Sequence, residues 1–352
     1  MRALLDSRPA AADRTGIRRH AQTLAAAACG PIGQHELLDG RDLLAFTSAW
    51  DEELTLPALL EREGVDVFHS PLFHLPCVLP TKAVVTIHDA IPATHPELTT
   101  AAFSQLWRQA GEAADRADAV VCPTEAARQD VLAALGLPPS KVHVVPESPH
   151  PAFRPPAQGE GAAVRQRYGL GAEPFLLVLG ALERRKNPAL LLDALRSRPD
   201  LPRVVFVGPA GSVDLTGEAE RHGVADRVRH LGVLPDADVV ALLGAAEVLV
   251  FPTLAEGFGL PVVEAFATET PVVASAVPAV VEVAGDAALL FPPGDAVALA
   301  SALARLVSEP DLARDLRARG QARLSQFTPE AVRAGLLRVY DWLQGTSAPG
   351  GA

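Results

Sequence analysis

Short apolar runs alternate with stretches of helical periodicity along almost the whole chain of 352 residues. A buried strand, then a helix, then a further buried strand is the pattern of a strand–helix–strand unit. Repetition of this unit predicts parallel sheets with helices on both faces, because parallel strands need a crossover connection. We therefore expect an α/β fold. The expected strands are 2–6, 65–68, 83–88, 119–122, 142–145, 175–179, 203–207, 228–231, 247–251, 272–274 and 288–291.

One segment divides this alternation into two series of similar length. Residues 149–161, PHPAFRPPAQGEG, are rich in proline and glycine, as interdomain linkers are. A chain of this length corresponds to roughly two domains. We therefore expect two doubly wound, Rossmann-like parallel-sheet domains, over 1–160 and 161–328, facing each other across a cleft. An amphipathic helix is expected over 329–345.

Charge and cysteine content restrict the classes of function. Asp and Glu number 42 against 31 Lys and Arg, a net charge of -11, which argues against a nucleic-acid partner. The cysteines, Cys29, Cys77 and Cys122, are odd in number and widely spaced, which favours a reducing cytoplasm over a disulfide framework or zinc site. We expect no signal peptide and, without an apolar run of about 18 residues, no membrane-spanning helix. Peripheral contact with the inner face of a membrane stays open.

The segment 251–267, FPTLAEGFGLPVVEAFA, follows a predicted strand and carries the richest polar pattern. Ligands of doubly wound sheets bind at the carboxyl ends of strands. Gly257 and Gly259 allow close approach of the backbone to a ligand, and amides at the following helix start attract anions. Glu256 and Glu264 offer carboxylates to sugar hydroxyls. Alternatively, Glu264 only complements the helix dipole and Glu256 is solvated.

A second segment, 179–190 or LGALERRKNPAL, also follows a predicted strand. Asn187 is expected to cap a helix that begins at Pro188. Arg185 and Lys186 stand directly before this cap, and two cations beside a helix N-terminus can clamp a diphosphate. The alternative is an exposed basic pair without a ligand.

Three further features carry weaker signals. His88 closes the predicted strand in VVTIHDAIP and could hydrogen-bond a substrate, although a lone histidine is more often structural. Gly16 in RTGIRR permits close backbone approach to a phosphate or an acceptor. Asp236 and Asp238 have the D-x-D spacing of some metal sites, but Pro235 precedes them at a predicted helix start. Helix capping is the better interpretation, and we expect no metal.

These segments, in this order, resemble the retaining glycosyltransferases of family 4, which have the GT-B fold, as far as about Tyr340. EGFGLPVVEA is similar to the family's E-x7-E motif, and GALERRKN to the G-T-L-E-P-R-K-N of a mannosyltransferase-like branch. VVTIHDAIP and EVAGDAALLFPPGD also match in place. The resemblance implies a GDP- or UDP-linked sugar donor, with neither a metal nor another cofactor.

The resemblance also implies a role for each matching position. Glu264 would hold the donor ribose, and Glu256 the donor sugar and its phosphates. Arg185 and Lys186 would bind the diphosphate and stabilise it as it leaves. His88 would contact the sugar near the reacting carbon. The remaining implied contacts are the amides of Phe258, Gly259 and Leu260 with the donor, Val233 near the base, and the helix 329–345 with the N-terminal domain.

We therefore expect a retaining, metal-independent glycosyltransferase that moves a mannose- or glucose-type hexose to a hydroxyl acceptor. Bacterial polysaccharide, glycolipid or glycosylated-metabolite synthesis would require such a reaction. Two alternatives stay open: a sugar-nucleotide epimerase or hydrolase of the same fold, and a non-catalytic sugar-nucleotide-binding protein. The sequence determines neither the acceptor nor the oligomeric state.

Overall fold

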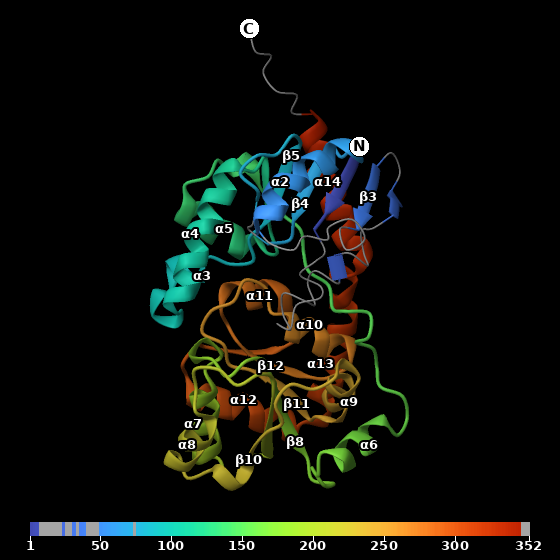
Figure 1. The fold of residues 1–352 in the computed structure, drawn as a ribbon. Helices are drawn as coiled ribbons and strands as arrows, with labels where there is room; N and C mark the ends of the chain where they lie inside the picture. Colours follow the sequence, from blue (N-terminus) through green and yellow to red (C-terminus); the bar gives the residue numbers. More distant parts are fainter. Residues whose placement is uncertain (7–22, 25–29, 33–34, 40–48, 73–74, 346–352) are drawn as a thin grey trace. The chain divides into compact units, whose positions relative to one another are not determined.

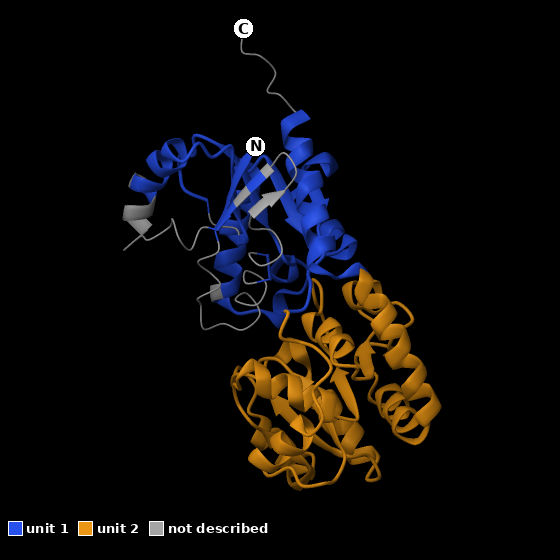
Figure 2. Cartoon of the chain, turned by 90° about the vertical axis from the view of Figure 1, so that its right-hand side faces the viewer, with its two compact units in different colours: residues 1–150, 326–352 blue, residues 151–325 orange. Residues whose placement is uncertain are grey.

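A computed structural model describes residues 1–6, 23–24, 30–32, 35–39, 49–72 and 75–345. It divides into two compact units, coloured separately in Figure 2. Unit 1 comprises Met1–His150 with Gln326–Ala352, and unit 2 comprises Pro151–Ser325. The division after His150 falls inside the proline- and glycine-rich segment. Each unit has its own sheet and its own core.

Unit 1 contains a seven-stranded sheet in the order β2-β3-β1-β4-β5-β6-β7. Its neighbouring strands pair in parallel except at the edge, where β2 is antiparallel to β3. This edge departs from the purely parallel sheet that we expected. The strands are β1 (Arg2–Leu5), β2 (Gly30–Ile32), β3 (His35–Asp39), β4 (Val67–Ser70), β5 (Lys82–Thr86), β6 (Ala119–Cys122) and β7 (Val142–Val144).

Local signals fix where the helices of unit 1 begin and end. Thr100 and Thr124 act as N-caps, because their side chains accept hydrogen bonds from backbone amides of the first helical turn. Gly136 ends one helix in the left-handed conformation, which glycine adopts without steric cost. The helices are α2 (Ala49–Arg62), α3 (Ile91–Thr94), α4 (Ala101–Arg116), α5 (Glu125–Leu135) and α14 (Pro329–Gly345).

The two faces of the unit 1 sheet are buried by different helices, since alternate residues of a strand point to opposite faces. On one face, Leu4 and Val85 pack in a core with residues of α2, α4 and α5. On the other face, Leu5 and Val84 pack with α14. This C-terminal helix, red in Figure 1, thus belongs to the core of unit 1. It contributes the buried residues Val332, Leu336, Val339, Tyr340 and Leu343.

A buried polar contact also joins α14 to the sheet. The His69 ring hydrogen-bonds the Tyr340 hydroxyl through Nδ1 at 2.8 Å and the Thr86 hydroxyl through Nε2 at 3.0 Å. All three side chains are almost completely shielded from solvent. Buried polar groups of this kind need partners, so the network favours one position of the helix on the strands.

Unit 2 contains a six-stranded parallel sheet in the order β10-β9-β8-β11-β12-β13. Its strands are nearly continuous apolar runs, as expected for strands covered on both faces. They are β8 (Phe175–Leu179), β9 (Arg203–Val207), β10 (Val228–His230), β11 (Val248–Phe251), β12 (Val272–Ser275) and β13 (Leu289–Phe291).

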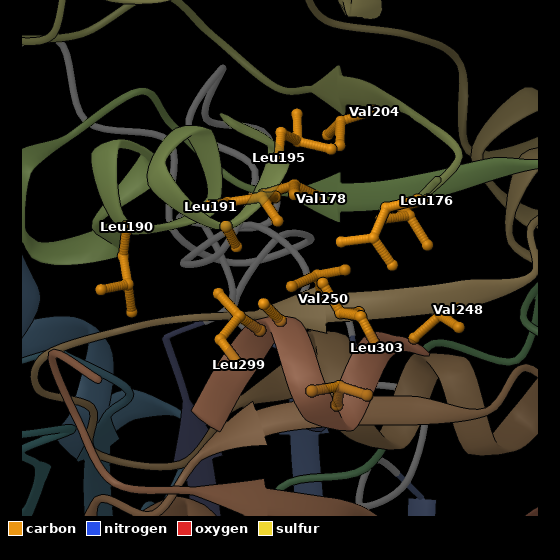
Figure 3. Close-up of a cluster of buried hydrophobic side chains, with 14 of the residues drawn as sticks. Leu176, Val178, Leu190, Leu191, Leu195, Val204, Val248, Val250, Leu299 and Leu303 are labelled. Atoms are coloured by element: carbon orange, nitrogen blue, oxygen red, sulfur yellow. The ribbon is translucent and has the colours of Figure 1, made fainter. Parts of the chain in front are cut away.

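Helices cover both faces of this sheet. Figure 3 shows part of one core, where Val178 and Val250 of the sheet lie near Leu191 of α7 and Leu299 of α12. No described helix has both the length and the apolar character needed to cross a membrane. The helices of unit 2 are α6 (Glu160–Arg167), α7 (Pro188–Ser197), α8 (Leu215–Arg221), α9 (Asp236–Ala245), α10 (Leu260–Ala267), α11 (Pro278–Ala284), α12 (Ala296–Ser308) and α13 (Pro310–Arg323).

Candidate functional site

The strand order of unit 2 indicates where its candidate site lies. From β8 the chain continues to β9 on one side, and it later returns to β11 on the other side. The crevice outside the carboxyl ends of two such strands is where doubly wound sheets bind ligands. The loop after β8 carries the predicted clamp, the loop after β11 carries Glu256, and the helix that follows this second loop carries Glu264. The topology therefore brings both motifs to one edge of the sheet.

The loop after β8 is shaped by two residues with positive φ. Gly180 has a φ of 135°, and a Cβ on it would lie 3.4 Å from Cε of Lys186. After a short 3-10 turn over Arg184–Lys186, Asn187 adopts the left-handed conformation with a φ of 52°. Asn187 precedes α7 as predicted, but its side chain makes no capping hydrogen bond. The side-chain capping prediction was wrong, because the residue serves the backbone turn instead.

The two loops meet at the carboxylate of Glu256. Its Oε1 accepts hydrogen bonds from the Lys186 ammonium at 2.5 Å and the Thr253 hydroxyl at 2.9 Å. The Arg185 guanidinium lies 2.6 Å from the same oxygen and also donates to the Ala255 carbonyl at 3.0 Å. The structure thus brings three predicted site residues together: Arg185, Lys186 and Glu256.

Burial and pairing shift the pKa values of this cluster. Burial lowers the pKa of Lys186, and nearby Arg185 lowers it further, against the opposing effect of Glu256. Burial alone would raise the pKa of Glu256, but Arg185 and Lys186 reverse this and hold its pKa below the usual value. Glu183 lies 3.7 Å from Arg185, so two cations face two carboxylates. A phosphate placed here would therefore compete with carboxylates for both cations.

The loop after β11 ends at the N-terminus of α10. Gly259 occupies the N-cap position with a φ of 108°, a conformation that other residues rarely adopt. No side chain caps this end, so its backbone amides can bind an anion. Phe258 is buried, Leu260 opens the helix and Glu264, in its second turn, is only 1% exposed. The Lys186 ammonium lies 4.8 Å from the centre of the Phe251 ring below the loop.

The other predicted positions are Val233, Gly16 and the D-x-D pair, and none of them has a hydrogen bond or an ion pair with this cluster among the described contacts. Val233 follows β10 in a loop and is 59% exposed. Gly16 lies outside the described residues. The D-x-D pair lies in the first turn of α9, but Pro235 is the N-cap residue and no side chain caps the helix. The capping prediction was therefore wrong.

The second aspartate of the D-x-D pair has local partners. Asp238 is buried, with 8% of the residue exposed, and its carboxylate accepts hydrogen bonds from the Tyr168 hydroxyl at 2.6 Å and from Arg167. These contacts join α9 to the end of α6, which gives Asp238 a structural role. Within the described residues, no group of three or more His, Cys, Asp or Glu side chains could hold a metal ion.

His88 belongs to unit 1 and is held there by two acceptors. β5 ends at Thr86, so His88 lies beyond the strand that we expected it to close. Its Nδ1 is 2.9 Å from Glu147 Oε1, and its Nε2 is 3.1 Å from the Pro71 carbonyl oxygen. Sequence reasoning missed Glu147. Its signal was an isolated acidic residue shortly after an apolar strand, at the edge where ligands of such sheets bind.

Comparison with known proteins gives two matching families. The description "Glycosyltransferase Family 4" matches residues 32–148, and "Glycosyl transferases group 1" matches residues 163–323. O-antigen chain mannosyltransferase B of Escherichia coli is 30% identical over 79% of this chain and 74% of its own length. MMP alpha-(1->4)-mannosyltransferase of Mycolicibacterium hassiacum is 32% identical over 62% of this chain, a match that spans 52% of that relative.

Solved structures share the fold at lower identity. Sucrose-phosphate synthase from Thermosynechococcus elongatus has a TM-score of 0.72 and 22% identity, with 98% of this chain and 99% of that chain covered. HepE of Anabaena in complex with UDP-glucose has a TM-score of 0.76 and 19% identity, with 97% and 99% covered. Together with the two doubly wound sheets, these matches confirm the predicted GT-B fold.

Proposed function

The chain belongs to glycosyltransferase family 4 and uses a nucleotide-sugar donor, and from this premise we propose a retaining, metal-independent transfer of a hexose. The donor sugar is of the mannose or glucose type, and the acceptor is a hydroxyl group. Two mannosyltransferases among the relatives support mannose, and a UDP-glucose complex among the structural neighbours supports the nucleotide-sugar class. The observation that carries the proposal is the convergence of Arg185, Lys186 and Glu256 at the switch point of the unit 2 sheet.

The proposed role of Arg185 and Lys186 is to stabilise the negative charge of the leaving diphosphate. When the bond between sugar and diphosphate breaks, negative charge grows on the leaving phosphate. Arg185, Lys186 and the amides at the start of α10 stabilise this charge more in the transition state than in the bound donor. Glu256 engages one of the three donors of the lysine ammonium, so the same ammonium can also contact a phosphate oxygen. Glu264 is proposed to hold the ribose.

The state of Glu256 supports retention without a covalent intermediate. Its carboxylate is bound by two cations and one hydroxyl, and its pKa is lowered by the cations. Such a carboxylate is a weak nucleophile, because its electron density is already engaged. The acceptor hydroxyl would instead attack from the face that the diphosphate leaves and pass its proton to a phosphate oxygen. An epimerase or hydrolase would release epimer or free sugar without an acceptor.

Donor binding tests the proposal directly. Titration with UDP, GDP, ADP, dTDP and their common sugar conjugates in EDTA is expected to give one clear nucleotide preference by calorimetry. The same ligand should raise the melting temperature, with about 2.7 kcal/mol of stabilisation at a concentration of 100 Kd. Glu264→Gln should weaken binding of that nucleotide. Absence of binding by every nucleotide would contradict the proposal.

Metal dependence is a separate prediction. Transfer activity is expected to persist in excess EDTA, because side-chain cations and helix amides neutralise the leaving diphosphate. Asp238→Asn should leave the donor affinity unchanged, since this carboxylate is engaged by Tyr168 and Arg167. If EDTA abolishes activity and manganese restores it, this prediction is contradicted. If manganese then fails to restore the activity of Asp238→Asn, the metal is assigned to the D-x-D pair.

A further inference from the structure

The contacts of His88 define its protonation state. A neutral imidazole has one N–H donor and one acceptor nitrogen. Here both ring nitrogens face oxygen atoms that accept hydrogen bonds, the Glu147 carboxylate at 2.9 Å and the Pro71 carbonyl at 3.1 Å. An ionised carboxylate and a carbonyl have no proton to donate. With Glu147 ionised, both contacts are hydrogen bonds only if the ring carries a proton on each nitrogen.

We propose that Glu147 is a positioning residue for His88, which keeps the imidazole doubly protonated and restricts it to donating hydrogen bonds. The Glu147 side chain is 6% exposed and that of His88 is 25% exposed, so the pair is largely removed from water. A buried carboxylate is costly without a cation, and the imidazolium supplies one. Each member therefore favours the charged form of the other.

The surrounding groups favour the same state. Burial alone would lower the pKa of His88, but Glu147 and, to a lesser extent, the Pro71 carbonyl and Asp89 raise it above the usual value. Strand β6 lies between β5 and β7 and ends at Cys122, whose pKa burial raises to about 12. The thiol is therefore neutral at physiological pH. Since the pKa is raised in the folded state, the pair contributes stability below about pH 6.5 and loses it as pH rises through the folded value.

This assignment limits what His88 can do in the reaction. A general base needs a ring nitrogen with a lone pair, and the imidazolium has none. His88 can instead donate through Nε2 to an oxygen of a substrate, which then replaces the Pro71 carbonyl as the acceptor. Participation in sugar transfer rests on the proposed function, whereas the protonation state of the ring does not.

Nuclear magnetic resonance of the histidine ring nitrogens tests the protonation state without substrate. His88→Gln identifies the signals. In the wild type, both nitrogens are expected to be protonated at pH 7, and Glu147→Gln should lower the pKa of His88 by about one unit or more. Glu125→Gln, which removes a half-exposed carboxylate from α5 of the same unit, is the matched control and should leave this pKa unchanged. A neutral ring in the wild type at pH 7, or equal pKa values in wild type and Glu147→Gln, would overturn the assignment.

The pH dependence of transfer gives the functional measurement. The wild-type rate is expected to fall at high pH as His88 loses its proton. In Glu147→Gln this fall should occur at a lower pH, displaced by the same amount as the pKa of the His88 ring. Identical alkaline limbs in the two proteins would overturn the positioning role. If no nucleotide binds but the ring titrates as expected, the proposed function fails and the His88 assignment stands.

Discussion

Replacement of Lys186 by alanine is expected to lower kcat by about 10²–10³-fold while the protein stays folded. The ammonium is one of two side-chain cations at the candidate diphosphate site, and its effect is greatest where charge develops on the leaving group. Folding should survive, because Glu256 keeps its contacts with Arg185 and Thr253. The carboxylate is then not left without a cation.

Arg184→Ala is the matched control for this variant. Arg184 is the first residue of the same 3-10 turn, two positions before Lys186, and it carries the same charge and is exposed to solvent. We expect it to retain close to wild-type kcat. Steady-state kinetics with the preferred donor, together with circular dichroism melts of both variants, separates catalysis from folding. Wild-type kcat in folded Lys186→Ala would refute the clamp.

The second large effect is expected on stability, from Gly208→Ala. Gly208 follows β9 with a φ of 145°, and a Cβ there would lie 2.1 Å from the carbonyl oxygen of Gly180. Neither backbone can move away without disturbing the β8–β9 pairing, so we expect a loss of roughly 3 kcal/mol or more in the free energy of unfolding. Because Gly180 begins the loop that carries Lys186, donor affinity should fall as well.

Gly223→Ala separates steric overlap from backbone strain. Gly223 also has a positive φ, 68°, but a Cβ there would meet no atom within 4 Å. Its replacement should therefore cost only about 1–2 kcal/mol, the strain of the left-handed conformation. Urea denaturation of the two variants measures the difference. Equal losses of stability would contradict the proposed contact between the two strand ends.

Local pattern predicted most of the sheet architecture. The expected strands 175–179 and 203–207 agree with β8 and β9, since strands buried on both faces are continuous apolar runs. The strand predictions failed where the strands are short and the apolar pattern covers few residues. The strands β2 and β3 were missed, and β2 carries Pro31, which an edge strand tolerates but which weakens the strand signal.

The sequence by itself determined the fold class and the loops that carry the polar side chains, because local periodicity records which residues are buried. The tertiary structure decided which side chains pair. Glu256 meets Lys186 across 70 residues, and Glu147 meets His88 across 59. Strand order sets these contacts by placing loops that are distant in sequence at one sheet edge. Local periodicity carries no information about that order, so the charge state of each site followed only from the folded chain.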